Sequence, residues 1–495
     1  MLGPSALMAG ADKKNSGSGE PGLVFNSLTF ALFFATILLL HNLPLPWSVK
    51  KFNLLIGSYL FYAAWNPPFI ILLWASTVVD WLVAMQIHRQ QDPRRRKAWL
   101  VISLVVNLGF LGFFKYGQFA LQNWQALMAL VGVHYEPPPW NILLPVGISF
   151  YTFHSMSYTL DIYLRRVEPI PKLFDFALFV TFFTQLVAGP ILRTADLVPQ
   201  FMTPRVATRN QLLWGLALMT LGLFEKVVVA DGALAHVADA VYGAMDPVGF
   251  VDGWIGTLAF SGQIFCDFAG YSTVAVGAAM SLGFSIPNNF NQPYAARGFS
   301  DFWRRWHISL STWLRDYLYV PLGGNRKGEW RTYANLMTTM LIGGLWHGAN
   351  WTFVVWGGLH GLYLSAERLL REQAARRPWL ARLGVPVVVM LVTYLFVDVT
   401  WVFFRAKTFA AASALLAAMA GMHPAAKPML PMVWILETCV AIGGILGAHA
   451  FMRERSLEDV VSRAHPAVLA TIWAAMAFLV IITQGSGDAF IYFQF

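Results

Sequence analysis

The chain has 495 residues, of which 57% are hydrophobic and only 12% are charged. A soluble globular domain carries about 25% charged residues, so this balance excludes a string of soluble domains. Apolar runs of roughly 18 to 20 residues, long enough to span a bilayer, recur along the chain. The net charge of +9 is spread over short loops, which is typical of a polytopic membrane protein and not of nucleic-acid binding. The two cysteines, Cys266 and Cys439, predict neither a disulfide framework nor a metal site.

The N-terminal part of the chain predicts a tail followed by membrane-spanning helices. Residues 1–22 are small and polar, which is typical of a flexible tail. The most basic loop, 88–97, is expected in the cytoplasm, and counting back three spans places the N-terminus outside. The apolar runs expected here are 23–40, 52–65, 69–87 and 99–114, with a weaker one at 121–133.

Three apolar stretches in the middle of the chain contain polar residues that a lipid-facing helix would not carry. They are 142–164, with Ser149, Tyr151, His154, Ser155, Ser157 and Asp161; 212–230, with Glu225 and Lys226; and 254–284, with Gln263, Asp267, Tyr271 and Ser272. We expect the first and third to line protein or a cavity, and the adjacent charges of the second to form a buried or interfacial polar feature. A further apolar run, 174–187, leads into a break at Gly189-Pro190.

The C-terminal third alternates apolar runs with basic loops. Spans are expected at 351–365, 385–404, 432–450 and 466–483, with a short interfacial segment at 410–420. The basic segment 367–382 and the charged loop 453–463 are expected inside. This count leaves the C-terminus on the outer side.

The stretch 302–317 predicts one amphipathic helix. Aromatic and aliphatic residues recur along it at spacings of 4, 4, 3 and 4, and the opposite face carries Arg304, His307, Ser311 and Arg315, with Asp316 beside it. The stretch is too charged to span lipid, so we expect it along the cytoplasmic interface. It predicts either a headgroup-binding helix or a cationic wall for an anionic donor such as the phosphate of coenzyme A or of phosphopantetheine.

His347 follows a largely apolar run and precedes a second one. Basic segments flank it at 326–331 and 367–382, so the chain between them is expected to enter the membrane and return. Each arm is long enough to carry His347 deep into the membrane, and deeper than His307. Irregular backbone at that depth is tolerated only inside protein or beside a cavity. A buried neutral imidazole suits general-base work near pH 7, whereas the alternative is a core histidine satisfied by one hydrogen bond.

Several stretches together resemble the membrane-bound O-acyltransferase family, and most closely its bacterial polysaccharide branch, the alginate O-acetyltransferase type. They are PVGISFYTFHSMSYTLDIY (145–163), VAGP (187–190), GQIFCDFAGYSTVAVG (262–277), NFNQPY (289–294), FWRRWHISLSTWLRDYLYVPLGG (302–324) and LWHGANWTFVVWGGLHG (345–361). The fifth and sixth stretches together are highly specific. The likeness covers most of the chain from residue 23 onward.

This resemblance implies an all-α polytopic fold with a ring of roughly 11–13 transmembrane or re-entrant helices around a central funnel. Residues 23–485 would form this membrane domain. The resemblance implies that His347 is catalytic and that His307 is its companion. The residues expected to bind the donor or line the funnel are Arg304, Arg305, Ser311, Arg315, Asp316, Asp267, Gln263, Trp346 and Asn350.

It also implies transfer of an acetyl group across the bacterial inner membrane to an exported polysaccharide of the alginate or cellulose type. The donor would be the thioester of acetyl-CoA or of an acyl carrier protein, with no bound cofactor or metal. Expected partners are membrane lipids, a periplasmic acetyltransferase of the SGNH-hydrolase type and a polysaccharide synthase or export complex, but no nucleic acid.

The aromatic tail 486–495 carries a second resemblance. Its F-x-Y-x-x-F ending, FIYFQF, is similar to that of the small membrane peptide of teichoic-acid D-alanylation, which implies that Tyr492 is an acyl relay. The alternative is an aromatic interfacial anchor. For the whole chain, peptidoglycan acetylation, teichoic-acid D-alanylation, lipid or sterol acylation, a transporter and a structural scaffold for a polymer synthase remain alternatives.

Overall fold

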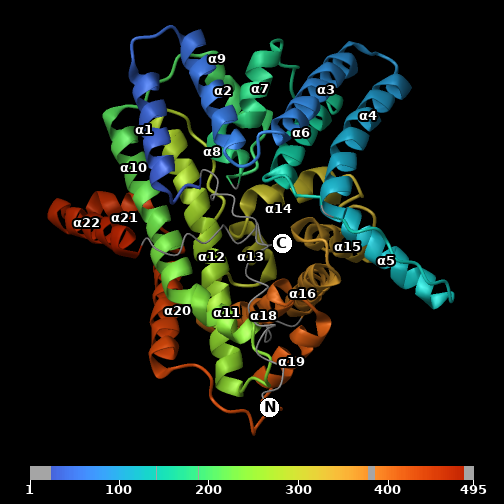
Figure 1. Cartoon of the computed structure of the whole chain (residues 1–495), viewed down its shortest axis with the longest axis vertical. Helices are drawn as coiled ribbons and strands as arrows, with labels where there is room; N and C mark the ends of the chain where they lie inside the picture. Colours follow the sequence, from blue (N-terminus) through green and yellow to red (C-terminus); the bar gives the residue numbers. More distant parts are fainter. Residues whose placement is uncertain (1–23, 141, 188, 377–384, 484–495) are drawn as a thin grey trace, which may run out of the picture.

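The computed structural model describes residues 24–140, 142–187, 189–376 and 385–483. Within these ranges all regular structure is helical, which confirms the all-α prediction. Two short central helices, α13 (Phe299–Arg305) and α14 (Ile308–Leu314), lie in the middle of a ring of longer ones (Figure 1). The predicted tails, including Tyr492, lie outside the described residues.

Seven helical runs of the described chain are long and apolar enough to cross a membrane, so this is a multi-pass membrane protein. Five are single helices: α3 (Phe69–Arg89), α12 (Phe250–Ser281), α18 (Pro386–Arg405), α20 (Met432–Met452) and α22 (Pro466–Thr483). Two are composite. One joins α4 (Pro93–Leu111), the π-helix η1 (Gly112–Tyr116) and α5 (Gly117–Leu130). The other joins α10 (Arg209–Leu223), the π-helix η2 (Phe224–Ala235) and α11 (His236–Tyr242).

Helix α12 is the axis of the fold, because almost all of its length is buried. It packs against α10 at two glycine pairs. A Cβ atom on Gly277 would lie 2.4 Å from the carbonyl oxygen of Gly215, and one on Gly222 would lie 2.4 Å from that of Gly270. Small residues let two helix backbones approach closely inside a membrane. The peripheral α22, by contrast, leaves nearly all its side chains for lipid.

Helix α6 (Ile148–Tyr163) is buried on almost every side, as its polar residues predicted. Asp80 of α3 accepts hydrogen bonds from Ser103 (2.6 Å) and Asn107 (2.8 Å) of α4, and Ser103 also contacts Thr159 of α6 at 3.0 Å. The other N-terminal helices are α1 (Leu28–Asn42), α2 (Trp47–Ala63), α7 (Leu173–Thr181), α8 (Phe183–Leu186) and α9 (Thr194–Met202).

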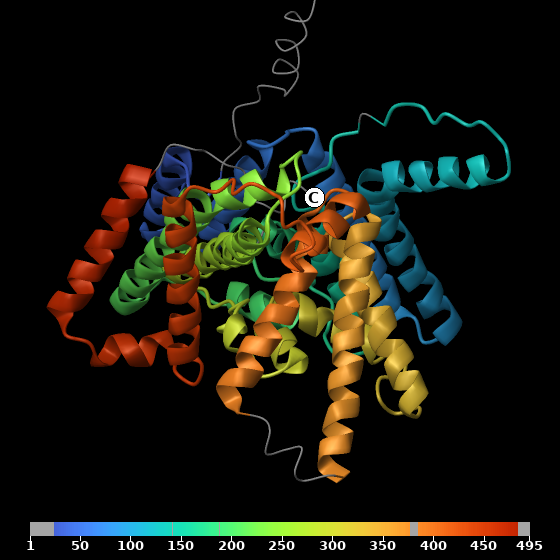
Figure 2. The same ribbon diagram turned by 90° about the horizontal axis from the view of Figure 1, so that it is seen from below.

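The remaining elements are the 3-10 turn η3 (Pro293–Ala295), the π-helix η4 (Arg315–Tyr319), α15 (Glu329–His347), α16 (Trp351–Arg376), α19 (Phe409–Met419) and α21 (Leu457–Arg463). The expected charged loop 453–463 is therefore wrong in part, because most of it forms the helix α21. The basic segment 367–382 is helical as far as Arg376, as the end of α16. Ion pairs one turn apart, such as Arg368–Glu372 at 3.0 Å, support this helical extension. Figure 2 shows α5 lying across one edge of the molecule, with the C-terminal end of α16 at the opposite edge.

Candidate active site

His347 lies at the turn between two closely packed helices. It is the last residue of α15, and after Gly348-Ala349-Asn350 the chain returns as α16. The two arms predicted on either side of His347 are therefore present. A Cβ atom on Gly344 would lie 2.2 Å from the carbonyl oxygen of Phe353, and one on Gly348 would lie 2.1 Å from the Phe353 ring. Glycine at these positions allows the close approach that buries His347.

His307 lies at a break in the chain, and not on a continuous helix. The prediction of one amphipathic helix over 302–317 is wrong, because α13 ends at Arg305 and α14 begins at Ile308. His307 itself has the left-handed backbone conformation, with φ of 43°. Asn289 stabilises the break: its backbone oxygen accepts from the Ile308 N–H at 2.9 Å, and its side-chain oxygen accepts from the Ser309 N–H at 3.1 Å. The same side-chain oxygen lies 3.2 Å from His307 Nδ1.

The two histidine rings lie together in the protein interior. Their centroids are 6.2 Å apart, and both side chains are buried. The prediction that His347 lies clearly deeper than His307 is therefore wrong. The Trp346 ring lies 5.9 Å from the His307 ring and 5.0 Å from the His347 ring, and Trp356 packs on His347 at 5.0 Å. This aromatic packing fixes the orientation of both imidazoles.

A cavity of about 340 Å³ reaches His347. Most of its lining is aliphatic and aromatic, with polar groups at Asn66, Lys115 and Ser149. Its walls come from the α2–α3 connection, η1, the segment 143–150, and the end of α15. These elements place the cavity near the start of α5, at the other end of α4 from the basic loop 88–97. Mostly apolar pockets with a few placed polar groups are typical of small-molecule sites.

Lys115 is the site residue that the sequence analysis missed. It lies on η1, and its Nζ donates to the backbone oxygens of Trp346 (2.6 Å) and His347 (3.1 Å) and to Ser149 Oγ (3.3 Å). The available signal was a lysine between apolar and aromatic residues in LGFFKYGQF. A charge in such a run is costly in lipid and indicates a role inside the protein.

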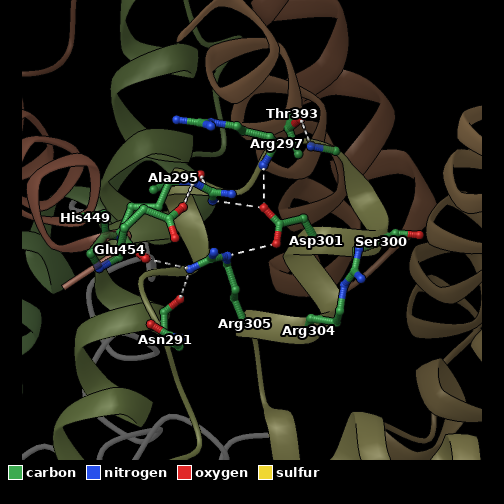
Figure 3. Close-up of polar contacts among 12 residues, drawn as sticks. Asn291, Ala295, Arg297, Ser300, Asp301, Arg304, Arg305, Thr393, His449 and Glu454 are labelled. Carbon is green, nitrogen blue, oxygen red and sulfur yellow. Dashed lines mark hydrogen bonds and ion pairs between the residues drawn. The ribbon is translucent and has the colours of Figure 1, made fainter. Parts of the chain in front are cut away.

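Figure 3 shows that Arg305 belongs to a network of paired charges and not to an open cationic wall. Asp301 accepts from Arg305 Nε at 2.9 Å, from Arg453 at 2.9 Å and from the Arg297 N–H at 2.9 Å. Burial raises the pKa of Asp301, but these hydrogen bonds outweigh burial and hold the pKa below its ordinary value. Arg304 is directed away from this network and donates to the Ser300 backbone oxygen at 3.1 Å (Figure 3).

A second group of paired charges lies on η4. Asp316 accepts from Arg315 at 2.7 Å and from Arg193 at 2.5 Å. Burial raises the pKa of Asp316, but the two guanidinium groups outweigh burial and lower it. Ser311 donates to the backbone oxygen of Trp306 at 3.1 Å. These residues, like Arg304 and Arg305, do not line the cavity beside His347.

The other predicted residues lie apart from the cavity. Asp267 forms an ion pair with Lys226, which also contacts Asp231 at 2.8 Å, so this group is a buried polar feature within η2 and α12. Gln263 is buried on α12. Asn350 caps α16 by accepting from the Thr352 N–H at 3.0 Å. Of the predicted set, the structure brings together His307, Trp346 and His347. No group of three or more His, Cys, Asp or Glu residues within the described ranges could hold a metal ion.

The fold and the cavity define a membrane-embedded protein with a buried pair of histidines, one of which, His347, lines a cavity. A model of the membrane-bound O-acyltransferase family matches residues 164–399. The chain is 43% identical over 402 residues to a probable alginate O-acetylase of Azotobacter vinelandii, which covers 80% of this chain and 78% of that relative.

Two further relatives have similar coverage. A probable alginate O-acetylase of Pseudomonas aeruginosa is 41% identical over 389 residues, covering 78% of this chain and 72% of the relative. A peptidoglycan O-acetyltransferase of Helicobacter pylori is 37% identical over 433 residues, covering 81% and 80%. The chain belongs to the membrane-bound O-acyltransferase family and is an O-acyltransferase.

Proposed function

We propose that this protein transfers acetyl groups from a cytosolic thioester across the bacterial inner membrane for O-acetylation of an exported polysaccharide. The observation that carries this proposal is the position of His347, which lines a mostly apolar cavity and lies 6.2 Å, ring to ring, from His307. The identity to alginate O-acetylases supports a polysaccharide acceptor of the alginate type. Cellulose is a related acceptor that we include in the proposal. The donor is the thioester of acetyl-CoA or of an acyl carrier protein.

The proposed reaction uses His347 as a general base. Its imidazole takes the proton from an acceptor hydroxyl, and the oxygen attacks the thioester carbonyl carbon. The carbon–sulfur bond then breaks, and the thiolate takes the proton back from the imidazolium as it leaves. His307, held by Asn289, lies close enough to orient the thioester or to stabilise the developing oxyanion. The surrounding aromatic rings exclude water and so protect the thioester from hydrolysis.

In this proposal the acetyl group leaves on the outer side, where a partner collects it. The cavity beside His347 lies near α5, at the other end of α4 from the basic loop 88–97 that we assign to the cytoplasm. Tyr492 is the proposed first acceptor, and a periplasmic acetyltransferase of the SGNH-hydrolase type passes the group to the polymer within a synthase or export complex. Both termini then lie in the periplasm.

Peptidoglycan is the second candidate acceptor. The Helicobacter pylori relative matches a share of this chain as large as the alginate relatives do. The same histidine chemistry serves either polymer, because both offer sugar hydroxyls. The composition of the acetylated material in cells with and without this protein distinguishes the two.

Replacement of His347 tests the proposed base. We expect His347→Ala and His347→Gln to lower the acetyl content of the exported polysaccharide at least about 100-fold, because general-base catalysis contributes that much. The acetyl content is measured by NMR spectroscopy and the protein level by immunoblotting of the membrane fraction. His134→Ala is the matched control, because this histidine side chain is 89% exposed. Normal acetylation with His347→Gln would contradict the assignment.

The relay has its own test. We expect mass spectrometry of the C-terminal peptide to detect acetylation of Tyr492, and Tyr492→Phe to abolish both this mark and polymer acetylation. Phenylalanine retains the aromatic ring, so an interfacial anchor would tolerate the change. Full polymer acetylation by Tyr492→Phe would rule out the relay while leaving the role of His347 open to its own test.

A further inference from the structure

The C-terminal end of α15 has its backbone oxygens capped by another helix. The last four carbonyl groups of an α-helix lack partners within the helix. In α15 these belong to Gly344, Leu345, Trp346 and His347. Among the described residues, only that of Gly344 accepts from the following backbone, at 3.4 Å from the Gly348 nitrogen. The other three need partners from elsewhere, because this end of the helix is buried.

Two consecutive side chains of η1 supply these partners. Tyr116 donates its hydroxyl to the backbone oxygen of Leu345 at 2.8 Å. Lys115 donates to those of Trp346 and His347 at 2.6 and 3.1 Å. Each of the three remaining oxygens therefore has one donor. π-Helical segments such as η1 are rare and are often found at functional sites.

The geometry of Lys115 indicates a positioning role and not direct contact with substrate. An ammonium group has three N–H donors. Those of Lys115 are all used, by Trp346, His347 and the hydroxyl of Ser149 at 3.3 Å. Its positive charge also lies at the negative end of the α15 dipole, where a cation stabilises a helix. Although Lys115 lines the cavity, it has no donor left for a ligand.

We propose that Lys115 and Tyr116 form a clamp that fixes the end of α15 and thereby positions His347 at the cavity. The clamp joins η1, which forms part of the cavity wall, to the end of α15, which carries His347. Movement of η1 therefore moves the imidazole of His347. This inference rests on the proposed role of His347 for its effect on acetylation, but its structural part does not. Lys115 and Tyr116 are positioning residues and take no part in bond making or breaking.

The test combines polymer acetylation with the chemical accessibility of His347. Lys115→Met retains the length of the side chain and removes its donors. We expect this variant to lower polymer acetylation about 10- to 100-fold, because a small displacement of a catalytic group has effects of that size. We also expect diethyl pyrocarbonate to modify His347 several-fold faster than in the unchanged protein, as followed by mass spectrometry of detergent-solubilised protein. Modification of the exposed His134 is the internal reference.

Two further variants test whether the hydrogen-bond donors of η1 are what positions His347. Lys115→Arg retains a cation with several donors, and we expect it to restore most of both readouts. Tyr116→Phe removes only the hydrogen bond to Leu345, and we expect smaller changes in the same direction. A normal modification rate of His347 in Lys115→Met would overturn the clamp, whatever happens to acetylation. Faster modification in Lys115→Met, together with normal acetylation by His347→Gln, would support the clamp and reject the proposed base.

Discussion

Charged residues have different roles in the surroundings of His347 and of His307. The cavity beside His347 is mostly apolar, and its cation, Lys115, holds backbone oxygens. The chain that precedes His307 is fixed by a dense ionic network around Asp301 (Figure 3). Glu367, in the C-terminal part of α16, accepts from the Ser300 N–H at 2.7 Å, which places this network toward the edge opposite to α5.

This difference shows that the charged groups described near the two histidines are engaged with other groups of the protein. Apolar side chains surround the cavity beside His347. Ion pairs instead anchor the irregular backbone that carries His307. Arg305 is two residues from His307, so its ion pair with Asp301 restrains the break between α13 and α14. Because these charged groups are paired, the imidazoles of His307 and His347 remain the groups best suited to the proposed acyl transfer.

Of the changes that compare these two regions, the largest effect is expected from blocking the cavity. Leu144 is a partly buried residue of its wall, and Leu144→Trp adds an aromatic ring where acceptor must pass. We expect polymer acetylation to fall at least about tenfold, because displacement of reacting groups by even a small distance has effects of this size. Acetyl content measured by NMR spectroscopy checks this prediction. Leu130→Trp, at a site on α5 that is 85% exposed, is the matched control. Unchanged acetylation by Leu144→Trp would show that acceptor reaches His347 by another route.

The sequence predicted the features that depend on local composition. The apolar arms around His347 and the polar residues of the α6 stretch led to the helical hairpin and to the buried helix that the structure contains. Both predictions rest on the cost of placing polar groups in lipid, which is a property of the sequence itself. The resemblance of the motifs also predicted the family.

The sequence did not predict features that depend on distant partners. The spacing of aromatic residues over 302–317 is that of a helix, yet Asn289 holds the break at His307 from outside that stretch. Arg305 is bound through Asp301 to Arg453, which lies 148 residues further along the chain. Periodicity carries no information about such contacts. The cationic wall was predicted for this reason. Lys115 was overlooked because its backbone partners, Trp346 and His347, lie more than 200 residues away.

The smallest effect is expected from weakening the ionic network. Asp301→Asn retains the shape of the side chain and removes its charge, and we expect the free energy of unfolding at pH 7 to fall by about 1–2 kcal/mol. Thermal unfolding of the detergent-solubilised protein checks this value. Glu454→Gln is the matched control, because Glu454 also contacts Arg453, at 3.0 Å, but is 74% exposed and should contribute little.

The pH dependence of the same variant separates charge from packing. The hydrogen bonds to Asp301 hold its pKa below the ordinary value of 3.8. Its stabilisation is therefore fully present above that value and is lost as the pH falls through the lower, folded-state pKa. We expect the difference in melting temperature between the unchanged protein and Asp301→Asn to be constant from pH 8 to about pH 5 and to shrink in more acidic buffer. A difference that persists equally in acid would mean that the charge of Asp301 is not what stabilises the break before His307. The contrast between the mostly apolar surroundings of His347 and the ionic surroundings of His307 would then lose its physical basis.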